Sequence, residues 1–553
     1  MKIIHNTGQS ILHQIRNGYD WIILSILILI ILLFIHLQLF EYGFDDAFIH
    51  FRLVENWIDT TTPYFNINDP VKSSSSSAWI IFLFTVYSTA SRIGLNPRLP
   101  QMAAVINSSM VLVGSLIYYK IILRVGKIRA RKSVYFAFSI TYFSLLFQSS
   151  IGLMETATAL VIVGIAFLFF IDRKNISFTL FVISIFFRLE LVVVFLLVLA
   201  FSVIARWFQI KKIFVYSLFG VIPFALFDFI YYGTLVPNTI TAKSQVYELS
   251  IVEQIGTIIS STGNSIKLFP FFDNLSLLYL FLLIFIPVVI LAVYTYRTIR
   301  RRENLIGIFG IIFLLWGVLI LCFYMVSGVV VFAWYRPLFS VPLFLVIWLI
   351  ISNIQDKRYA FWNFMAFTPI LILQSMFLIQ YLPAAVLNPA YAPGFAEGAR
   401  TRQYIQFGQQ LYHEYPQANL MSSEIGGLGY GFKGNIMDAG GLVTPEALDF
   451  HPLKVPEERS SGGLGGIPQG LVTKLSPEII VSYDIFIEAL AGSELIKDYK
   501  ISQYPVFLEE DRKYSKVDTP WGTIQKELWG VENLYVFVRN DIPDLKNKEI
   551  EID

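Results

Sequence analysis

The chain has 553 residues, of which 55% are hydrophobic and only 15% are charged, and its mean hydropathy is +0.61. A soluble domain could not bury that much apolar surface, so the composition predicts a membrane protein that crosses the bilayer several times. The net charge of +2 gives no sign of a nucleic-acid partner. The single Cys322 lies inside an apolar run, which excludes an internal disulfide and a cysteine metal cluster.

Apolar segments of membrane-spanning length recur through residues 1–383 and predict an all-α membrane domain with about eleven transmembrane helices. The first segment is too long for a signal peptide and lacks its cleavage site, so we expect it to be retained. Ala78–Ala90 is short and is expected to lie at the outer interface, within an outer loop of residues 41–101. The expected spans are Trp21–Phe40, Met102–Leu123, Ser133–Ile151, Thr156–Ile171, Phe178–Phe187, Leu189–Ala205, Ile213–Tyr232, Ser276–Thr295, Leu305–Met325, Phe339–Ile351 and Phe361–Tyr381.

Basic residues set the expected orientation, because loops rich in Lys and Arg stay in the cytoplasm. The loop Arg124–Lys132 carries five such residues, and with a cytoplasmic amino terminus every later basic loop falls on the same side. The tail, residues 384–553, is then outside the cell membrane. Within it, Glu397–Tyr415 is expected to form an amphipathic helix, and Ile479–Ser482 and Leu534–Val538 are expected to form strands. The tail is therefore predicted to be an extracytoplasmic mixed α/β domain.

Two adjacent aspartates, Asp45 and Asp46, follow directly after the first apolar segment. A carboxylate at the membrane border is costly to desolvate, so a function or a partner usually holds it there. One aspartate would be enough to cap the helix expected to run to about Trp57. The other would be available as a general base for a hydroxyl nucleophile. His50 lies one turn after Asp46 and could share a divalent cation with it, although no further cluster of ligands accompanies the pair.

Charged residues also interrupt the apolar sequence between two of the expected spans. Arg188 and Glu190 could form a mutual salt bridge at a hairpin tip. Alternatively, Arg188 could hold a phosphate, which its planar guanidinium suits. Glu155 begins a helix after a polar outer loop, where an interaction with the helix dipole and a functional role are equally good explanations.

Two further outer segments are rich in turn residues. Tyr231–Lys243 contains Gly and Pro, which alone would predict only a loop, and Lys243 could be a solvated surface charge. In the tail, Gly426–Tyr430 and Asp438–Leu442 superficially resemble phosphate loops. They lack the GxGxxG spacing and are expected on the outer side, so a nucleotide is not expected there.

Taken in order, these residues resemble the GT-C superfamily of polytopic glycosyltransferases, and specifically the branch that contains the mycobacterial arabinofuranosyltransferase AftB. Two elements of that branch are altered here. Val71 to Trp79 keeps the length of V-E-G-Y-T-N-P-L-W but carries Lys72 and serines, and R-P-E-G is half kept at Arg188 and Glu190. The shared elements are D-D-A-F-I-x-x-R from Asp45 to Arg52, M-E-T from Met154 to Thr156, Y-Y-G-x-L-x-P-N-T-x-x-A-K from Tyr231 to Lys243, and D-x-x-G-L from Asp438 to Leu442.

The resemblance implies a glycosyltransferase of the cell membrane that moves a sugar such as arabinofuranose from a polyprenyl-phosphate donor to a glycan or glycoconjugate outside the cytoplasm. Asp45 or Asp46 would remove the acceptor proton, with Asp45 preferred because it is nearer the membrane exit and comes first in the shared motif, and one displacement would invert the anomeric centre. The donor phosphate would contact Arg188, Lys243 and Arg52. The substrates would also contact residues of the other shared elements, namely Glu155, Glu190, Tyr232, Asn238 and Asp438.

Two functions from other classes are weighed against this one. A transporter of lipid-linked or small polar substrates often shows repeated halves and charges near the bilayer midplane. This sequence has no visible halves, and its unusual charges are expected at one surface. A membrane receptor or scaffold with an outer binding tail would leave the charges at the membrane border unexplained.

Overall fold

The computed structural model describes residues 2–126, 132–247, 249–263, 305–353, 378–453, 466–519, 522–526 and 531–543. Nine of the eleven expected spans fall on apolar helices of this part of the chain. The span expected at Ser276–Thr295 and most of the one at Phe361–Tyr381 lie outside the described residues, so the total of eleven stays a prediction.

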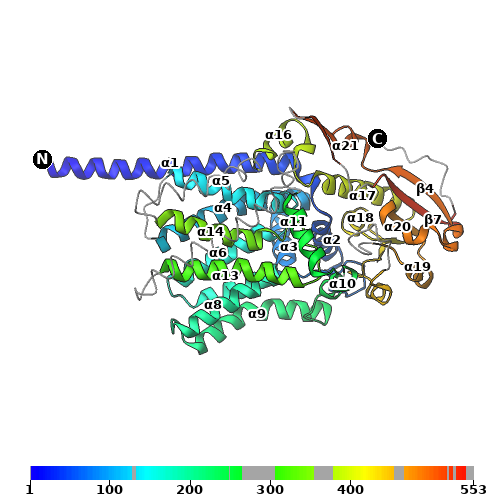
Figure 1. Cartoon of the computed structure of the whole chain (residues 1–553), viewed down its shortest axis with the longest axis horizontal. Coiled ribbons are helices and arrows are strands. Elements are labelled where there is room, and N and C mark those ends of the chain that lie inside the picture. The colour runs from blue at the N-terminus through cyan, green and yellow to red at the C-terminus, as the bar shows by residue number, and fades with distance from the viewer. Residues whose placement is uncertain are drawn as a thin grey trace.

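The apolar helices run side by side along the long axis of the molecule (Figure 1). They are α1 (Lys2–Leu39), α4 (Leu99–Gly126), α5 (Lys132–Ile151), α6 (Thr156–Ile171), α7 (Ile176–Phe187), α8 (Val192–Ile204), α9 (Ile210–Tyr232), α13 (Leu305–Val326) and α14 (Pro337–Asn353). Among the described residues, five helical segments are long and apolar enough to cross a membrane. They confirm the prediction of a multi-pass membrane protein. The five segments are Trp21–Tyr42, Leu99–Gly126, Val134–Ile151, Ile210–Tyr232 and Leu305–Val326.

Shorter elements connect these helices, most of them at the end of the bundle next to the tail domain (Figure 1). The segment expected to lie at the outer interface forms a separate 16-residue helix, α3, which packs against α2 and α7. The elements are η1 (Phe40–Tyr42), α2 (Asp45–Thr60), α3 (Ser77–Arg92), η2 (Leu189–Leu191), α10 (Asn238–Tyr247), α11 (Ile251–Gly263), α16 (Tyr381–Val386) and η5 (Pro389–Tyr391).

The tail folds into a mixed α/β domain, as predicted, around a five-stranded sheet of order β2-β1-β3-β7-β4. β1 pairs in parallel with β2 and β3, whereas β7 runs antiparallel to β3 and β4. The strands are β1 (Asn419–Ser422), β2 (Asn435–Asp438), β3 (Ile479–Tyr483), β4 (Tyr499–Pro505) and β7 (Asn533–Arg539), and a separate hairpin joins β5 (Lys516–Thr519) to β6 (Gly522–Gln525). The helices are α17 (Phe395–Glu414), α18 (Gly426–Gly431), η6 (Pro445–Phe450), α19 (Gln469–Leu475), α20 (Asp484–Ala491), η7 (Glu494–Asp498) and α21 (Glu509–Arg512).

The two faces of this sheet belong to different cores, because side chains alternate along each strand. Leu420 and Val481 face the core that continues through α17 into the membrane helices. Met421 and Ile480, one position along, face a smaller core under η6 and α19. The tail domain is therefore packed onto the membrane domain through its own hydrophobic interior.

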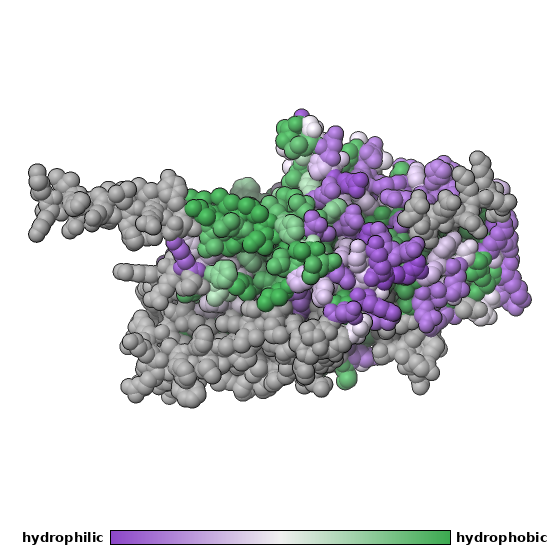
Figure 2. Space-filling view, turned by 90° about the horizontal axis from the view of Figure 1, so that it is seen from above, coloured by the Kyte–Doolittle hydropathy of each residue, from purple (hydrophilic) through white to green (hydrophobic). Residues whose placement is uncertain are grey.

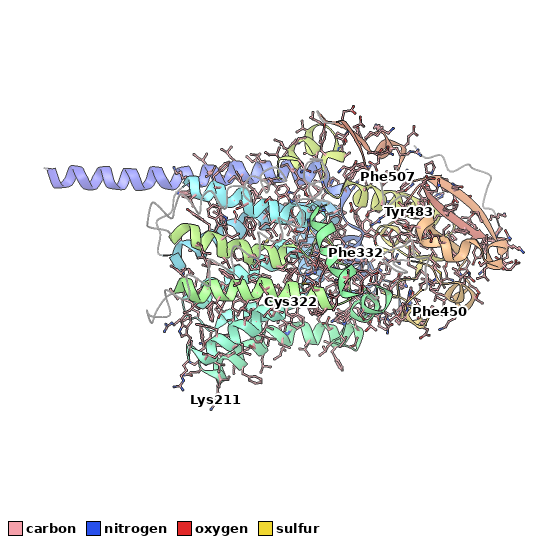
Figure 3. All side chains as sticks on the ribbon, viewed as in Figure 1. Lys211, Cys322, Phe332, Phe450, Tyr483 and Phe507 are labelled. Atoms are coloured by element: carbon pink, nitrogen blue, oxygen red, sulfur yellow. The ribbon has the colours of Figure 1, made fainter. Side chains whose placement is uncertain are left out.

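Hydrophobic and hydrophilic surface residues are also separated between the membrane domain and the tail domain. On the face shown in Figure 2, hydrophobic residues gather over the helices and hydrophilic residues over the tail domain. Lys211, at the start of α9, lies at the end of the bundle far from the tail (Figure 3). At helix ends reaching that same end, Arg124 forms an ion pair of 2.8 Å with Asp172. The described basic residues Arg124 and Lys211 therefore lie at the end of the bundle opposite the tail domain.

Candidate functional site

Asp45 connects the membrane domain to the tail. The N-cap position of α2 is Phe44, which makes no side-chain cap, and the Asp45 carboxylate instead accepts hydrogen bonds from the tail. Its Oδ2 accepts from the Gly426 amide at 2.8 Å and its Oδ1 from the Gly427 amide at 2.7 Å. Burial raises the pKa of Asp45, and the two amides oppose that shift because they favour the charged form. Both oxygens are committed to holding α18.

The glycine-rich sequence of α18 has a packing explanation. A Cβ atom on Gly426 would overlap the Asp45 carbonyl oxygen, and one on Gly431 would overlap the carbonyl oxygen of Ile405. Both approaches are far closer than van der Waals contact, so α18 can fit between α2 and α17 only if these positions lack side chains. The resemblance of this segment to a phosphate loop is therefore superficial, as the spacing had indicated.

Asp46, the next residue, faces a different partner. Its Oδ2 lies 3.1 Å from the Nζ of Lys243 on α10. The Asp46 side chain is 27% exposed and that of Lys243 is 19% exposed, so this ion pair is reachable from a cavity. The Lys243 Nζ also donates to the Tyr335 hydroxyl at 3.1 Å and lies 5.6 Å from the Phe332 ring centre. The two neighbouring aspartates thus have separate environments.

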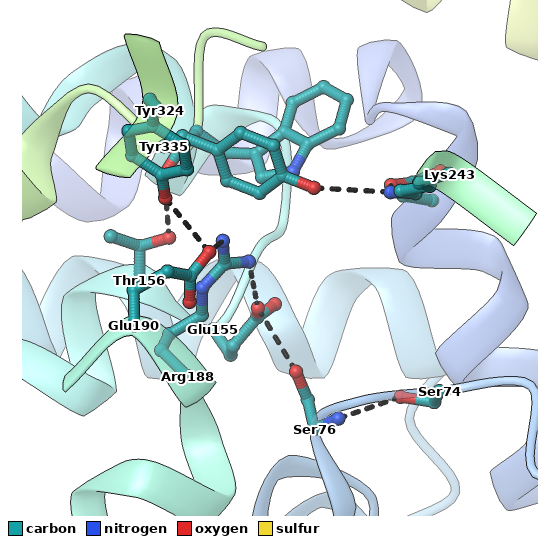
Figure 4. A network of polar contacts seen from close by, with 11 residues as sticks. Ser74, Ser76, Glu155, Thr156, Arg188, Glu190, Lys243, Tyr324 and Tyr335 are labelled. Carbon is teal, nitrogen blue, oxygen red and sulfur yellow. Dashed lines mark hydrogen bonds and ion pairs between the residues drawn. The ribbon is translucent and has the colours of Figure 1, made fainter. Parts of the chain in front are cut away.

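Arg188 lies between two carboxylates (Figure 4). The backbone is extended at this residue, so α7 ends at Phe187 and the guanidinium points into the space beside α6. Its Nη1 is 2.6 Å from Glu155 Oε1, and its Nη2 is 2.8 Å from Glu190 Oε1. Burial alone would raise the pKa of Glu155, but Arg188 overcomes it and lowers that pKa below its ordinary value. The salt bridge expected between Arg188 and Glu190 is present and includes Glu155 as well.

A cavity of about 540 Å³ lies against this cluster. It is bounded by the outer ends of α2, α8, α10 and α13 and by the serine run before α3. Several residues that line it carry a buried polar atom that has no hydrogen-bond partner among the described residues. These atoms are His50 Nδ1, Ser73 Oγ, Glu155 Oε2, Arg188 Nε, Thr239 Oγ1 and Trp334 Nε1.

A second cavity, of about 150 Å³, lies between α2 and the tail domain. Arg400 on α17 and Glu424 beside α18 line it, with Arg400 Nη2 3.1 Å from Glu424 Oε1. Burial raises the pKa of Glu424 to about 7, although Arg400 opposes the shift. The residues that line both cavities are Asp46, Lys243, Trp334 and Leu442. The two spaces therefore meet at the Asp46–Lys243 ion pair.

Two residues expected at the site lie outside both cavities. Arg52 is 1% exposed and donates to the carbonyl oxygens of Phe65, Gly429, Phe432 and Gly434 at 2.5 to 2.7 Å. It therefore anchors the tail to α2. The Tyr232 hydroxyl is also buried and donates to the Pro63 carbonyl at 2.7 Å, which secures the outer loop.

Asn238 and Asp438 hold one loop of the tail in place. Asp438 accepts from the Gly440 amide at 2.8 Å and from the Leu442 amide, which closes the turn after β2. The Asn238 side chain donates to the carbonyl oxygens of Gly441 at 2.5 Å and Leu442 at 3.1 Å. This interlock places Leu442 at the wall shared by the two cavities, although neither polar side chain lines a cavity itself.

Comparison with known proteins addresses the fold. No protein-family model and no curated protein matches the sequence. The crystal structure of ArnT from Cupriavidus metallidurans in the apo state superposes with a TM-score of 0.51 at 11% identity, covering 94% of this chain and 98% of that one. ArnT is a GT-C glycosyltransferase. The chain shares the fold of ArnT. The structure of ArnT bound to undecaprenyl phosphate has a TM-score of 0.49 at 12% identity, with the same coverage.

The sequence singled out most of the charged residues around the two cavities but not all of them. The candidates Asp46, Glu155, Arg188, Glu190 and Lys243 line the larger cavity, and Asp45, Asp46 and Lys243 line the smaller one. Arg400 and Glu424 were missed, because each is a single charge in a polar tail with no unusual neighbours. One weak signal was available, since Arg400 lies on the helix expected at Glu397–Tyr415 and Glu424 just before the glycine run.

No group of three or more His, Cys, Asp or Glu side chains able to hold a metal ion occurs in the part of the chain that the structure describes. Asp46 and His50 both line the larger cavity, but together they supply only two ligands. A divalent cation there would need further ligands from a substrate or from water, and it stays a prediction.

Proposed function

We propose that the protein is a membrane glycosyltransferase that moves a sugar from a polyprenyl-phosphate donor to a hydroxyl group of an extracytoplasmic glycan. The observation that carries this proposal is the meeting of two cavities at Asp46 and Lys243. A transfer reaction between two substrates needs two binding spaces with a shared reacting point. The larger space is next to the membrane helices and suits a lipid-linked donor, and the smaller space faces the tail and suits the acceptor.

Asp46 is the better general base of the pair. Both oxygens of Asp45 accept backbone amides, so removing a proton from a substrate would require breaking the contact with α18. Asp46 keeps a partly exposed carboxylate at the junction of the two cavities. A hydroxyl entering from the smaller cavity would lose its proton to Asp46 as its oxygen attacks the anomeric carbon in the larger one. This single displacement inverts the anomeric centre.

Lys243 and Arg188 are the candidates to stabilise the departing lipid phosphate. Both already form ion pairs, but Lys has three N–H donors and Arg has five, so each can donate to a phosphate oxygen while keeping its carboxylate partner. Charge that develops on a leaving group is stabilised most by donors already fixed in place. The contacts of Lys243 with Asp46 and Tyr335, and those of Arg188 with Glu155 and Glu190, hold the two cations in such positions.

The donor class is supported by the fold and by the sequence together. ArnT, whose apo structure shares this fold, has been crystallised with undecaprenyl phosphate. A pentofuranose such as arabinofuranose is suggested by the motifs shared with the AftB branch. The basic end of the bundle would be cytoplasmic and the tail extracytoplasmic. A cysteine at exposed Lys474 should then react with an impermeant thiol reagent in intact cells, in a Cys322→Ser background, whereas one at Lys211 should not.

The proposed activity is tested with purified protein and a radiolabelled polyprenyl-phosphate arabinofuranose. We expect the label to leave the lipid and enter an envelope glycan fraction, with Asp46→Asn inactive. Asp449→Asn is the matched control, because Asp449 is 72% exposed and lines neither cavity. Movement of intact labelled lipid across proteoliposome membranes, with no cleavage of the sugar–phosphate bond, would instead favour the transporter.

A further inference from the structure

The serine run that replaces a shared motif is a buried wall of the larger cavity. Serines in a loop are normally solvated, yet Ser73, Ser74 and Ser76 are each no more than 5% exposed. Ser74 Oγ accepts from the Ser76 amide at 3.0 Å, and Ser76 Oγ donates to Glu155 Oε1 at 3.2 Å (Figure 4). The run is therefore folded against Glu155 rather than against water.

Both ends of the run are fixed to the membrane domain. Lys72, just before it, forms a 2.6 Å ion pair with Asp228 Oδ2 on α9 and donates to the Leu235 carbonyl at 2.8 Å. Ser77, at the other end, donates to Asp228 Oδ1 at 2.6 Å. Since Lys72 and Asp228 are 5% and 1% exposed, this anchor is buried and the serines between its two contacts have little freedom to move. A rigid row of hydroxyl groups is suited to recognise a ligand of fixed shape.

Three polar atoms around this wall lack partners among the described residues. They are Ser73 Oγ, His50 Nδ1 and Glu155 Oε2, and all three are buried side-chain atoms of residues that line the cavity. A buried polar atom without a hydrogen bond destabilises a protein, so such atoms are usually satisfied by a ligand or by water. Here three of them gather on one wall, which indicates a ligand with several hydrogen-bonding groups.

The charges of the cavity define the chemical class of that ligand. Three carboxylates and two cations line it: Glu155 and Glu190 share Arg188, and Asp46 pairs with Lys243. Among the described lining residues negative charge is therefore in excess, which disfavours a sugar that itself carries a carboxylate. Burial lowers the pKa of His50, which favours its neutral form. A hydroxyl group, which both donates and accepts, matches serine, imidazole and carboxylate atoms at once.

We propose that Ser73–Ser76, His50 and Glu155 form the subsite for the sugar of the donor, and that this subsite selects an uncharged, hydroxyl-bearing sugar over an acidic one. The proposal rests on the proposed function, because it takes the lipid phosphate to lie near Arg188 and Lys243. In this proposal the serine run determines which sugar is bound, whereas Arg188 and Lys243 determine binding of the lipid phosphate.

The test compares the affinities of two lipids for the detergent-purified protein: bare polyprenyl phosphate and polyprenyl-phosphate arabinofuranose. Ser73→Ala and His50→Phe should each weaken binding of the sugar-bearing lipid by about fivefold to tenfold, which is the usual contribution of one hydrogen bond. Binding of the bare lipid should stay unchanged, and this also shows that the variants are folded. Ser502→Ala, in the exposed strand β4, is the control that should alter neither affinity.

The wild-type protein should also bind the neutral sugar lipid at least tenfold more tightly than the same lipid carrying a uronic acid. Equal affinity for those two lipids would overturn the proposed selectivity. An unchanged ratio of sugar-lipid to bare-lipid affinity in both variants would overturn the subsite, while the proposed function would stand. Failure of the wild-type protein to bind either lipid would overturn both proposals.

Discussion

Exchange of each neighbouring aspartate for asparagine should have opposite consequences for stability and for rate. The amide side chain of the Asp45→Asn variant would keep one acceptor oxygen but would turn an NH2 group toward a backbone amide that also donates. Asp45→Asn therefore loses one charge-assisted hydrogen bond outright and weakens the other. Since hydrogen bonds to charged groups contribute about 1.5–3 kcal/mol each, we expect a loss of roughly 3 kcal/mol in the free energy of unfolding.

Asp46→Asn removes only a partly exposed ion pair, which contributes about 1 kcal/mol or less. An amide cannot take a proton at neutral pH, so its transfer rate should fall roughly a hundredfold or more. That loss corresponds to about 2.7 kcal/mol in the activation barrier. Asp45→Asn should thus mainly lower stability, and Asp46→Asn should mainly lower the rate of sugar transfer.

The assay measures melting temperature in detergent and sugar transfer per folded molecule for wild type, Asp45→Asn, Asp46→Asn and the control Asp449→Asn. We expect Asp45→Asn to melt well below wild type and Asp46→Asn to melt close to it with almost no transfer. Near-wild-type transfer by Asp46→Asn would refute general-base catalysis by this residue. An inactive Asp45→Asn with an unchanged melting temperature would refute the assignment of Asp45 to domain docking.

Three further substitutions test other parts of the site. Arg188→Lys should weaken binding of polyprenyl phosphate several-fold although the charge remains, because the planar fork is lost; equal affinity would exclude Arg188 from phosphate binding. Arg52→Met should lower the free energy of unfolding by about 3–5 kcal/mol, since it leaves buried carbonyl oxygens unpaired. A stable Arg52→Met variant that binds the donor poorly would instead support a role of Arg52 in donor binding. The pKa of Glu424 is raised from 4.5 to about 7, so stability from its protonated form is present below pH 4.5 and lost as pH rises through about 7. Glu424→Gln should flatten this fall of up to about 3 kcal/mol in melting curves taken from pH 5 to 8, and parallel curves for variant and wild type would contradict the assigned pKa.

The sequence by itself determined the class of the protein and the side on which its unusual residues gather. Apolar segments of bilayer length have few alternatives to helices, because unpaired backbone groups cannot be left in lipid. The positions of α4, α5, α6 and α13 could therefore be predicted within a few residues, whereas α1 begins at Lys2, well before the predicted Trp21. The basic loops could be predicted to lie on one side of the membrane, because loops rich in Lys and Arg stay in the cytoplasm and each membrane-crossing helix reverses the direction of the chain.

Only the tertiary structure decided what each polar residue does. Asp45 and Asp46 are adjacent and carry the same side chain, but helix geometry turns one toward α18 and the other toward Lys243. Arg52 and Asn238 have partners up to 382 residues away in the chain, so no local pattern could reveal that they join the tail to the membrane domain. Partners of this kind are chosen by packing between distant segments, and that packing exists only after the tail has folded onto the helices.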